Sequence, residues 1–134
     1  MNTKPLQYNP APTQEKATAV SGWLEEKKAE DVLAIDIAAE RAFTDAVLIA
    51  GAQSQRHAQG LADFVLEQCR KEGYEFLRME GYQSGQWILL DLNDLVVNIL
   101  LRDQRDLYRL EELWPKGRLL HDGRIQAPRP ASIE

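Results

Sequence analysis

Apolar residues change their spacing several times along this chain, and each change marks the border of a predicted element. Between Ser54 and Gly73 they recur three and four residues apart, as on one face of an α-helix: Ala58, Leu61, Ala62, Val65, Leu66 and Cys69. Ser54 or Gln53 can cap the start of this helix, and Gly73 can end it in a left-handed conformation. A weaker apolar stripe predicts an earlier helix over residues 13–30, with Thr13 as its cap.

Short runs that are almost continuously apolar predict strands, because such runs suit a sheet that is covered on both faces. They are residues 32–38, 46–50, 74–79, 87–91 and 95–101. The last two runs are joined by Leu92, Asn93 and Asp94. Because asparagine tolerates positive φ, these two strands are predicted to form a hairpin.

The C-terminal part completes the predicted architecture. Asp103 is predicted to cap a final helix that ends at Pro115, with an apolar face of Leu107, Leu110 and Trp114. The order of elements favours an α/β (α+β) fold, in which a single mixed β-sheet is flanked by helices. Prolines are frequent at the N-terminal end, and prolines and glycines at the C-terminal end, so we expect three segments. They are a flexible N-terminal segment (1–12), one domain (13–115) and a disordered C-terminal tail (116–134).

Composition and charge narrow the class of protein. The chain has 134 residues, 44% of them hydrophobic, which is enough for one core without metals or disulfides. Residues 1–114 carry 12 Lys or Arg against 19 Asp or Glu, a net charge of -7, while residues 115–134 carry four against two, or +2. Such an acidic body favours a basic protein partner over DNA, although it also serves solubility. No apolar run would span a membrane and no signal peptide is evident, so we expect a cytoplasmic protein.

Few residues suit catalysis. The single cysteine, Cys69, lies on the apolar face of its helix and is expected to be a buried structural residue. His57 and His121 are 64 positions apart, so a histidine metal site is not expected. The turn from Gly51 to Ser54 follows a strand and opens a helix, as a triphosphate-binding turn does, but a strand with two carboxylates for magnesium is missing. We expect no catalytic residue, metal or cofactor, and a nucleotidyltransferase-like enzyme is kept only as an alternative.

The stretch from Gln86 to Trp114 is the most informative: QWILLDLNDLVVNILLRDQRDLYRLEELW. Both faces of its hairpin are apolar, so we expect one face under helices and the other under a further helix or a partner chain. The stretch resembles the ribosomal silencing factor family (RsfS/Iojap). That family has the pattern W-I/V-L-I/L-D-Y/F-G-D-V/I-V-V-H-I/V-F, followed by R-x-F/Y-Y-x-L-E-x-L-W.

The resemblance extends upstream, over residues 17–114. The strand before Gly51 resembles the apolar strand that precedes the first glycine turn of the family, and Glu80-Gly81 matches the pair before the next loop. Ser54-Gln55-Arg56-His57, with Ala62-Asp63, resembles the start of the following helix. The chain departs from the pattern at several positions. Among them are four where the family usually has an aromatic residue, glycine, histidine and phenylalanine: Ala46, Asn93, Asn98 and Leu100. No family role is therefore carried over to Asn98 or Leu100.

The resemblance implies a nucleotidyltransferase-like fold without the catalytic residues, and a role as a ribosomal silencing factor. Such a protein binds the large ribosomal subunit through its ribosomal protein fourteen. It sterically blocks joining of the small subunit and represses translation under nutrient limitation. The resemblance also allows a homodimer. The competing hypothesis is a catalytically inactive scaffold or dimerisation module that uses the same hairpin.

Five residues form the candidate partner-binding site. Trp87 is interpreted either as a core residue or as an interface anchor. Tyr108 lies one position off the apolar helix face, so its ring is expected to be half exposed, which favours an interface. Asp91 and Asp94 either shape the turn or pair with basic side chains of the partner, and Glu111 is either a solvated residue or a further such contact.

Overall fold

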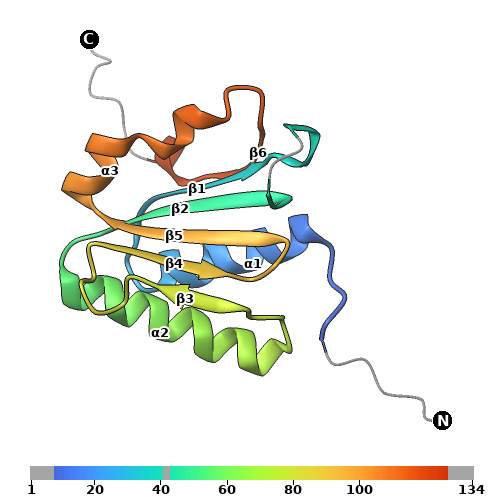
Figure 1. Ribbon diagram of the computed structural model, residues 1–134, viewed down its shortest axis with the longest axis horizontal. Helices are drawn as coiled ribbons and strands as arrows, with labels where there is room; N and C mark the ends of the chain where they lie inside the picture. The colour runs from blue at the N-terminus through green and yellow to red at the C-terminus, as the bar shows by residue number, and fades with distance from the viewer. Residues whose placement is uncertain (1–7, 41–42, 127–134) are drawn as a thin grey trace.

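The computed structural model describes residues 8–40 and 43–126, which form one mixed six-stranded sheet with helices on both faces (Figure 1). The strand order is β3-β4-β5-β2-β1-β6; β2 and β5 pair in parallel and the other neighbouring strands pair antiparallel. This confirms the predicted fold class. The elements, with η for 3-10 helices, are α1 (Thr13–Glu26), β1 (Glu30–Asp36), η1 (Ala38–Glu40), β2 (Ala46–Ala52), α2 (Gln55–Glu72), β3 (Arg78–Glu80), β4 (Trp87–Asp91), β5 (Leu95–Leu101), α3 (Arg102–Tyr108), η2 (Leu110–Leu113), β6 (Arg118–Asp122) and η3 (Gly123–Gln126).

The ends of α2 follow the local sequence. The side chain of Ser54 accepts a hydrogen bond from the backbone N–H of His57 at 3.0 Å, so Ser54 is the cap. Gly73 has φ 76°, a left-handed conformation that glycine adopts without a Cβ penalty. The prediction for α1 is wrong at both ends. Pro12 occupies the cap position without a side-chain bond, and Thr13 donates to Asp94 instead. The helix ends at Glu26, and Glu30, its expected last residue, begins β1.

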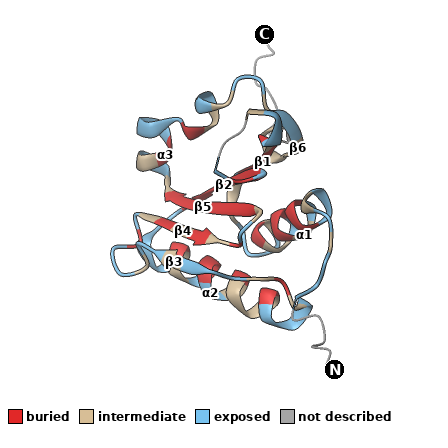
Figure 2. Cartoon of the chain, turned by 45° about the vertical axis from the view of Figure 1, so that its right-hand side comes forward, coloured by how far each residue is buried: buried red, intermediate tan, exposed pale blue. Residues whose placement is uncertain are grey.

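Two layers of side chains enclose the sheet. One face lies under α1 and α2 and holds the larger core, in which Leu24, Leu48 and Ile88 are fully buried. The opposite face carries a smaller cluster, formed by Leu33, Ile35, Ile37, Val47, Ile49, Leu100 and Leu110, against which Trp87 and Trp114 pack. Figure 2 shows buried residues along the inner strands and on the sides of α1 and α2 that face them, whereas α3 is largely exposed.

The hairpin of β4 and β5 has the predicted bounds. Ile88 and Leu90 are fully buried, whereas the alternate positions Trp87 and Leu89 are half-buried on the other face. The turn residue Asn93 has φ 82°, as its tolerance of positive φ predicts. Both hairpin strands are therefore placed as the alternation of the sequence indicates.

Two further predicted elements are wrong in extent. The strand expected over residues 74–79 shrinks to β3 at the edge of the sheet. The final helix breaks at Arg109, which has φ 47°, so Leu107, Leu110 and Trp114 do not share one helical face. The break turns Leu110 onto the smaller core and leaves Leu107 69% exposed. Asp103 is not the cap, because Leu101 holds that position without a side-chain bond.

The tail expected to be disordered over residues 116–134 instead contributes a strand. β6 pairs antiparallel with β1, and η3 follows it, whereas residues 127–134 lie outside the described part of the chain. The Nη2 atom of Arg118 lies 2.8 Å from Oδ2 of Asp36, and Nε2 of His121 lies 2.7 Å from Oε2 of Glu25. These contacts come from residues more than 80 positions away, so local composition could not predict them.

Part of the predicted flexible N-terminal segment (1–12) also has defined contacts, although residues 1–7 lie outside the described residues. The backbone N–H of Asn9 donates to the carbonyl of Gly73 at 2.7 Å, and its side-chain amide donates to the carbonyl of Glu72 at 3.1 Å. Residue 9 is therefore joined to the C-terminal end of α2.

Candidate functional site

An aromatic pair lies where β4 and α3 meet. Trp87 is the first residue of β4 and packs partly against the smaller core, and Tyr108 is the last residue of α3. Their ring centroids are 5.1 Å apart, with the planes tilted by 48°. Tyr108 is 50% exposed, which confirms the half exposure predicted for it, while Trp87 combines core packing with partial exposure.

Two further apolar side chains are exposed on the element that carries Tyr108 and on the one that follows it. Leu107 on α3 is 69% exposed, and Leu113 on η2 is 61% exposed. We call Trp87, Leu107, Tyr108 and Leu113 the docking surface. Exposed leucines next to an aromatic pair are characteristic of a protein interaction site, because large apolar side chains gain free energy when a partner covers them.

A buried amide supports the aromatic pair from beneath. The indole N–H of Trp87 donates to Oδ1 of Asn98 at 3.0 Å, and Nδ2 of Asn98 donates to the carbonyl of Leu48 at 3.4 Å. Asn98 is 5% exposed, in the middle of β5. Asn98 was not predicted from the sequence to have a role; the one sign of it there is a polar residue in an otherwise apolar strand.

The two candidate aspartates lie at the opposite end of the hairpin from Trp87. Oδ1 of Asp91 accepts from the backbone N–H of Asn93 at 2.9 Å, and its Oδ2 lies 3.5 Å from Nε of Arg78. Asp94 accepts from Nζ of Lys16 and from the hydroxyl of Thr13, both at 2.6 Å. Both aspartates therefore have partners within the chain, and the fold does not bring them together with the docking surface.

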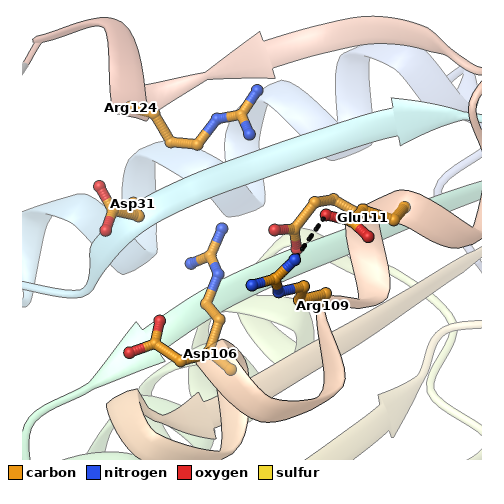
Figure 3. A pocket seen from close by; sticks show the side chains of 7 residues that line it. Asp31, Asp106, Arg109, Glu111 and Arg124 are labelled. Carbon is orange, nitrogen blue, oxygen red and sulfur yellow. Dashed lines mark ion pairs between the residues drawn. The ribbon is translucent and has the colours of Figure 1, made fainter.

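Glu111 lines a charged cavity of about 280 Å³ between α3, η2, β1 and η3 (Figure 3). The other lining residues are Asp31, Arg105, Asp106, Arg109, Glu112 and Arg124. The Oε1 atom of Glu111 is buried and has no hydrogen-bond partner among the described residues. Glu111 is thus placed inside this cavity and is neither a simple solvated residue nor a member of the docking surface.

The arginines of the cavity are held by the fold in different ways. Burial lowers the pKa of Arg105, whose Nη1 donates to the carbonyl of Glu30 at 3.2 Å. Nε of Arg124 donates to Asp122 at 2.9 Å, and this bond raises the pKa of Arg124 and lowers the pKa of Asp122. Arg109 lies 3.7 Å from Glu112. The cavity therefore holds charges of both signs, and none of the described residues that line it is a serine, cysteine or histidine.

The cysteine and the two histidines, which were the remaining candidates for chemistry, make structural contacts. Cys69 is buried, and desolvation raises the pKa of its thiol to about 11, so the thiolate form is scarce at neutral pH. His57 contacts the carbonyl of Lys27, and His121 contacts Glu25, on separate elements. Within residues 8–40 and 43–126, no three His, Cys, Asp or Glu side chains gather as a metal site would require. In the same ranges, no helix is both long and apolar enough to cross a membrane.

These features define a small α/β domain with an exposed aromatic docking surface beside a charged cavity. The model of the family described as "Ribosomal silencing factor during starvation" matches residues 10–133. The chain therefore belongs to the ribosomal silencing factor family. This confirms the family resemblance noted in the sequence.

Individual relatives agree with this assignment. A ribosomal silencing factor of Bacillus subtilis is 36% identical over 90 residues, which span 67% of this chain and 76% of that protein. A more distant relative is the mouse protein named "Mitochondrial assembly of ribosomal large subunit protein 1", 27% identical over 68% of this chain and 41% of its own length. A crystal structure of a Chromobacterium violaceum protein has a TM-score of 0.72 at 28% identity, and covers 77% of this chain and 87% of that one.

Proposed function

We propose that this protein binds the large ribosomal subunit and sterically blocks joining of the small subunit, which represses translation when nutrients are limited. The observation that carries the proposal is the docking surface on a chain of this family. The partner we propose is ribosomal protein fourteen of the large subunit, in the cytoplasm. Blocking requires only that the bound protein occupy the joining surface, so no catalytic step is involved.

The aromatic centre of the docking surface and the acidic body of the chain support a protein partner of basic character. That centre is the Trp87–Tyr108 pair, and aromatic residues are the most frequent energetic anchors of interfaces. The segment that carries Tyr108 presents exposed Asp103, Asp106 and Glu112 together with exposed Arg102 and Arg109, and Arg109 pairs with Glu112. The match to a basic ribosomal surface therefore rests on the net charge of -7 over residues 1–114, which would steer the encounter. The mouse relative named for large-subunit assembly supports the choice of subunit.

Sedimentation tests the proposal directly. The protein should co-migrate with isolated large subunits on a sucrose gradient, and should be absent from small subunits and from joined ribosomes. A protein that co-migrates with joined ribosomes at the same occupancy cannot be a steric blocker of joining. A protein that binds no subunit, and instead self-associates through the docking surface, would support the scaffold or dimerisation hypothesis.

A further inference from the structure

Asn98 is a buried amide in a strand whose neighbouring residues, Val97 and Ile99, are apolar. A buried amide lowers stability unless its donor and acceptor atoms are both bonded. Both ends are bonded here, Oδ1 to the indole N–H of Trp87 and Nδ2 to the carbonyl of Leu48. The side chain thus links β4, β5 and β2 across the sheet face that carries the docking surface.

The hydrogen bond to Trp87 fixes the orientation of the indole ring as well as its contact partner. Trp87 stands opposite Leu100 in the strand pairing, whereas Asn98 lies two positions earlier in β5, opposite Leu89. The indole must therefore lean diagonally over the sheet to reach Oδ1, a span that aromatic side chains can cover. In this orientation the N–H edge meets Asn98, and the ring lies against Tyr108.

We propose that Asn98 is a positioning residue for the docking surface. Its amide, held by the Leu48 carbonyl, fixes the Trp87 ring so that Trp87 and Tyr108 form one surface before the partner arrives. The benefit is preorganisation, because a ring that is already fixed loses less rotamer entropy on binding. The effect on binding rests on the proposed function, whereas the effect on the indole can be measured in the free protein.

The test begins with three variants of the full chain. Asn98→Leu keeps the branched skeleton of the side chain and removes the acceptor, Trp87→Phe removes the donor, and the third variant combines both changes. With the tryptophans labelled with nitrogen-15, the three indole N–H resonances are observed, and that of Trp87 is identified by its loss in Trp87→Phe. We expect Asn98→Leu to speed hydrogen exchange of this N–H and to weaken large-subunit binding about 3–10-fold, the size of one hydrogen bond.

The combined variant and a rescue distinguish positioning from stability alone. With Trp87→Phe already present, adding Asn98→Leu should not weaken binding further, because the bond is already absent. Asn98→His at pH 8 should restore slow exchange and binding, because a neutral imidazole nitrogen can accept the same N–H. Thermal unfolding of each variant reports the accompanying change in stability.

Unchanged indole exchange in Asn98→Leu would overturn the proposal. It would also be overturned if binding losses were additive in the combined variant and followed the loss of stability. If the wild-type protein binds no large subunit, the proposed function fails. The exchange rate then still decides whether Asn98 fixes the Trp87 ring.

Discussion

The rings of Trp87 and Tyr108 lie 5.1 Å apart between centroids, although 20 residues separate them in the chain. The contact joins the first residue of β4 to the last residue of α3, directly before the helix breaks at Arg109. Trp87 packs onto the core while Tyr108 keeps half of its surface exposed. In this pair the Trp87 ring is held by the core, while the Tyr108 ring is accessible to a partner. This is the arrangement that an interface anchor requires.

Replacing Tyr108 by alanine should weaken binding to large subunits by about 1–2 kcal/mol, as expected for an aromatic anchor. The fold should survive because the ring is only half covered within the chain. Binding is measured by titration of purified large subunits, and folding by thermal unfolding. Tyr8→Ala is the matched control, since Tyr8 is 47% exposed near the other end of the chain. Equal binding by the Tyr108 and Tyr8 variants would remove Tyr108 from the interface.

Asp106→Asn should slow association with large subunits and reduce its dependence on salt, with a smaller change in dissociation. Asp106 is exposed beside Leu107, and salt screens charge interactions over about 8–10 Å at moderate ionic strength. Association rates at several salt concentrations provide the measurement. Glu26→Gln is the control, because it removes an exposed charge from α1 on the opposite face. If both variants respond alike, overall charge and not the docking surface governs the encounter.

Asp94→Ala should lower the free energy of unfolding by about 2–4 kcal/mol. Its effect on the free energy of binding to large subunits should be smaller. The carboxylate of Asp94 accepts from Lys16, whose side chain is 5% exposed, so removing it would strand a buried ammonium group. Chemical denaturation measures the loss. Asp45→Ala is a suitable comparison, because Asp45 is exposed in the neighbouring loop. A stable Asp94→Ala variant with weakened binding would instead support the partner-binding role considered from the sequence.

Acid should weaken the fold partly through Glu30. The hydrogen bond from Arg102 lowers the pKa of Glu30 in the folded state. The stabilisation of the fold by this pair is therefore complete above the unfolded pKa near 4. It is lost as the pH falls through the lower folded value. Arg102→Gln should therefore show a smaller drop in unfolding temperature between pH 5 and pH 3 than the wild type. An identical drop in both proteins would mean that this pair does not contribute.

Local patterns predicted the elements whose stabilisation is local or strictly periodic. The stripe from Ala58 to Cys69 and the Gly73 stop placed α2, and alternation placed β4 and β5 at their observed bounds. The left-handed turn at Asn93 followed from the tolerance of asparagine for positive φ.

Long-range contacts account for what the sequence did not reveal. β6 depends on pairing with β1, and its own residues include exposed Arg118 and Leu119 without a clear alternation. The helix breaks at Arg109, a non-glycine residue with φ 47°. Local propensity disfavours this conformation, and the packing of Leu110 in the smaller core offsets its cost. Of the candidate site, Trp87 and Tyr108 were named from the sequence as separate candidates, and the contact between their rings was not predicted. The support that Asn98 gives to Trp87 depends on its hydrogen bond to the carbonyl of Leu48 in β2. The sequence of β5 alone does not indicate that bond.

Subunit joining is the most direct test of the account. Large subunits are incubated with the wild-type protein, small subunits are added, and light scattering follows the formation of joined ribosomes. We predict that the wild type prevents joining in proportion to its occupancy of large subunits, whereas Tyr108→Ala requires about 5–30-fold more protein, the equivalent of 1–2 kcal/mol. Joining that proceeds at the normal rate and extent on large subunits saturated with the wild-type protein would contradict it.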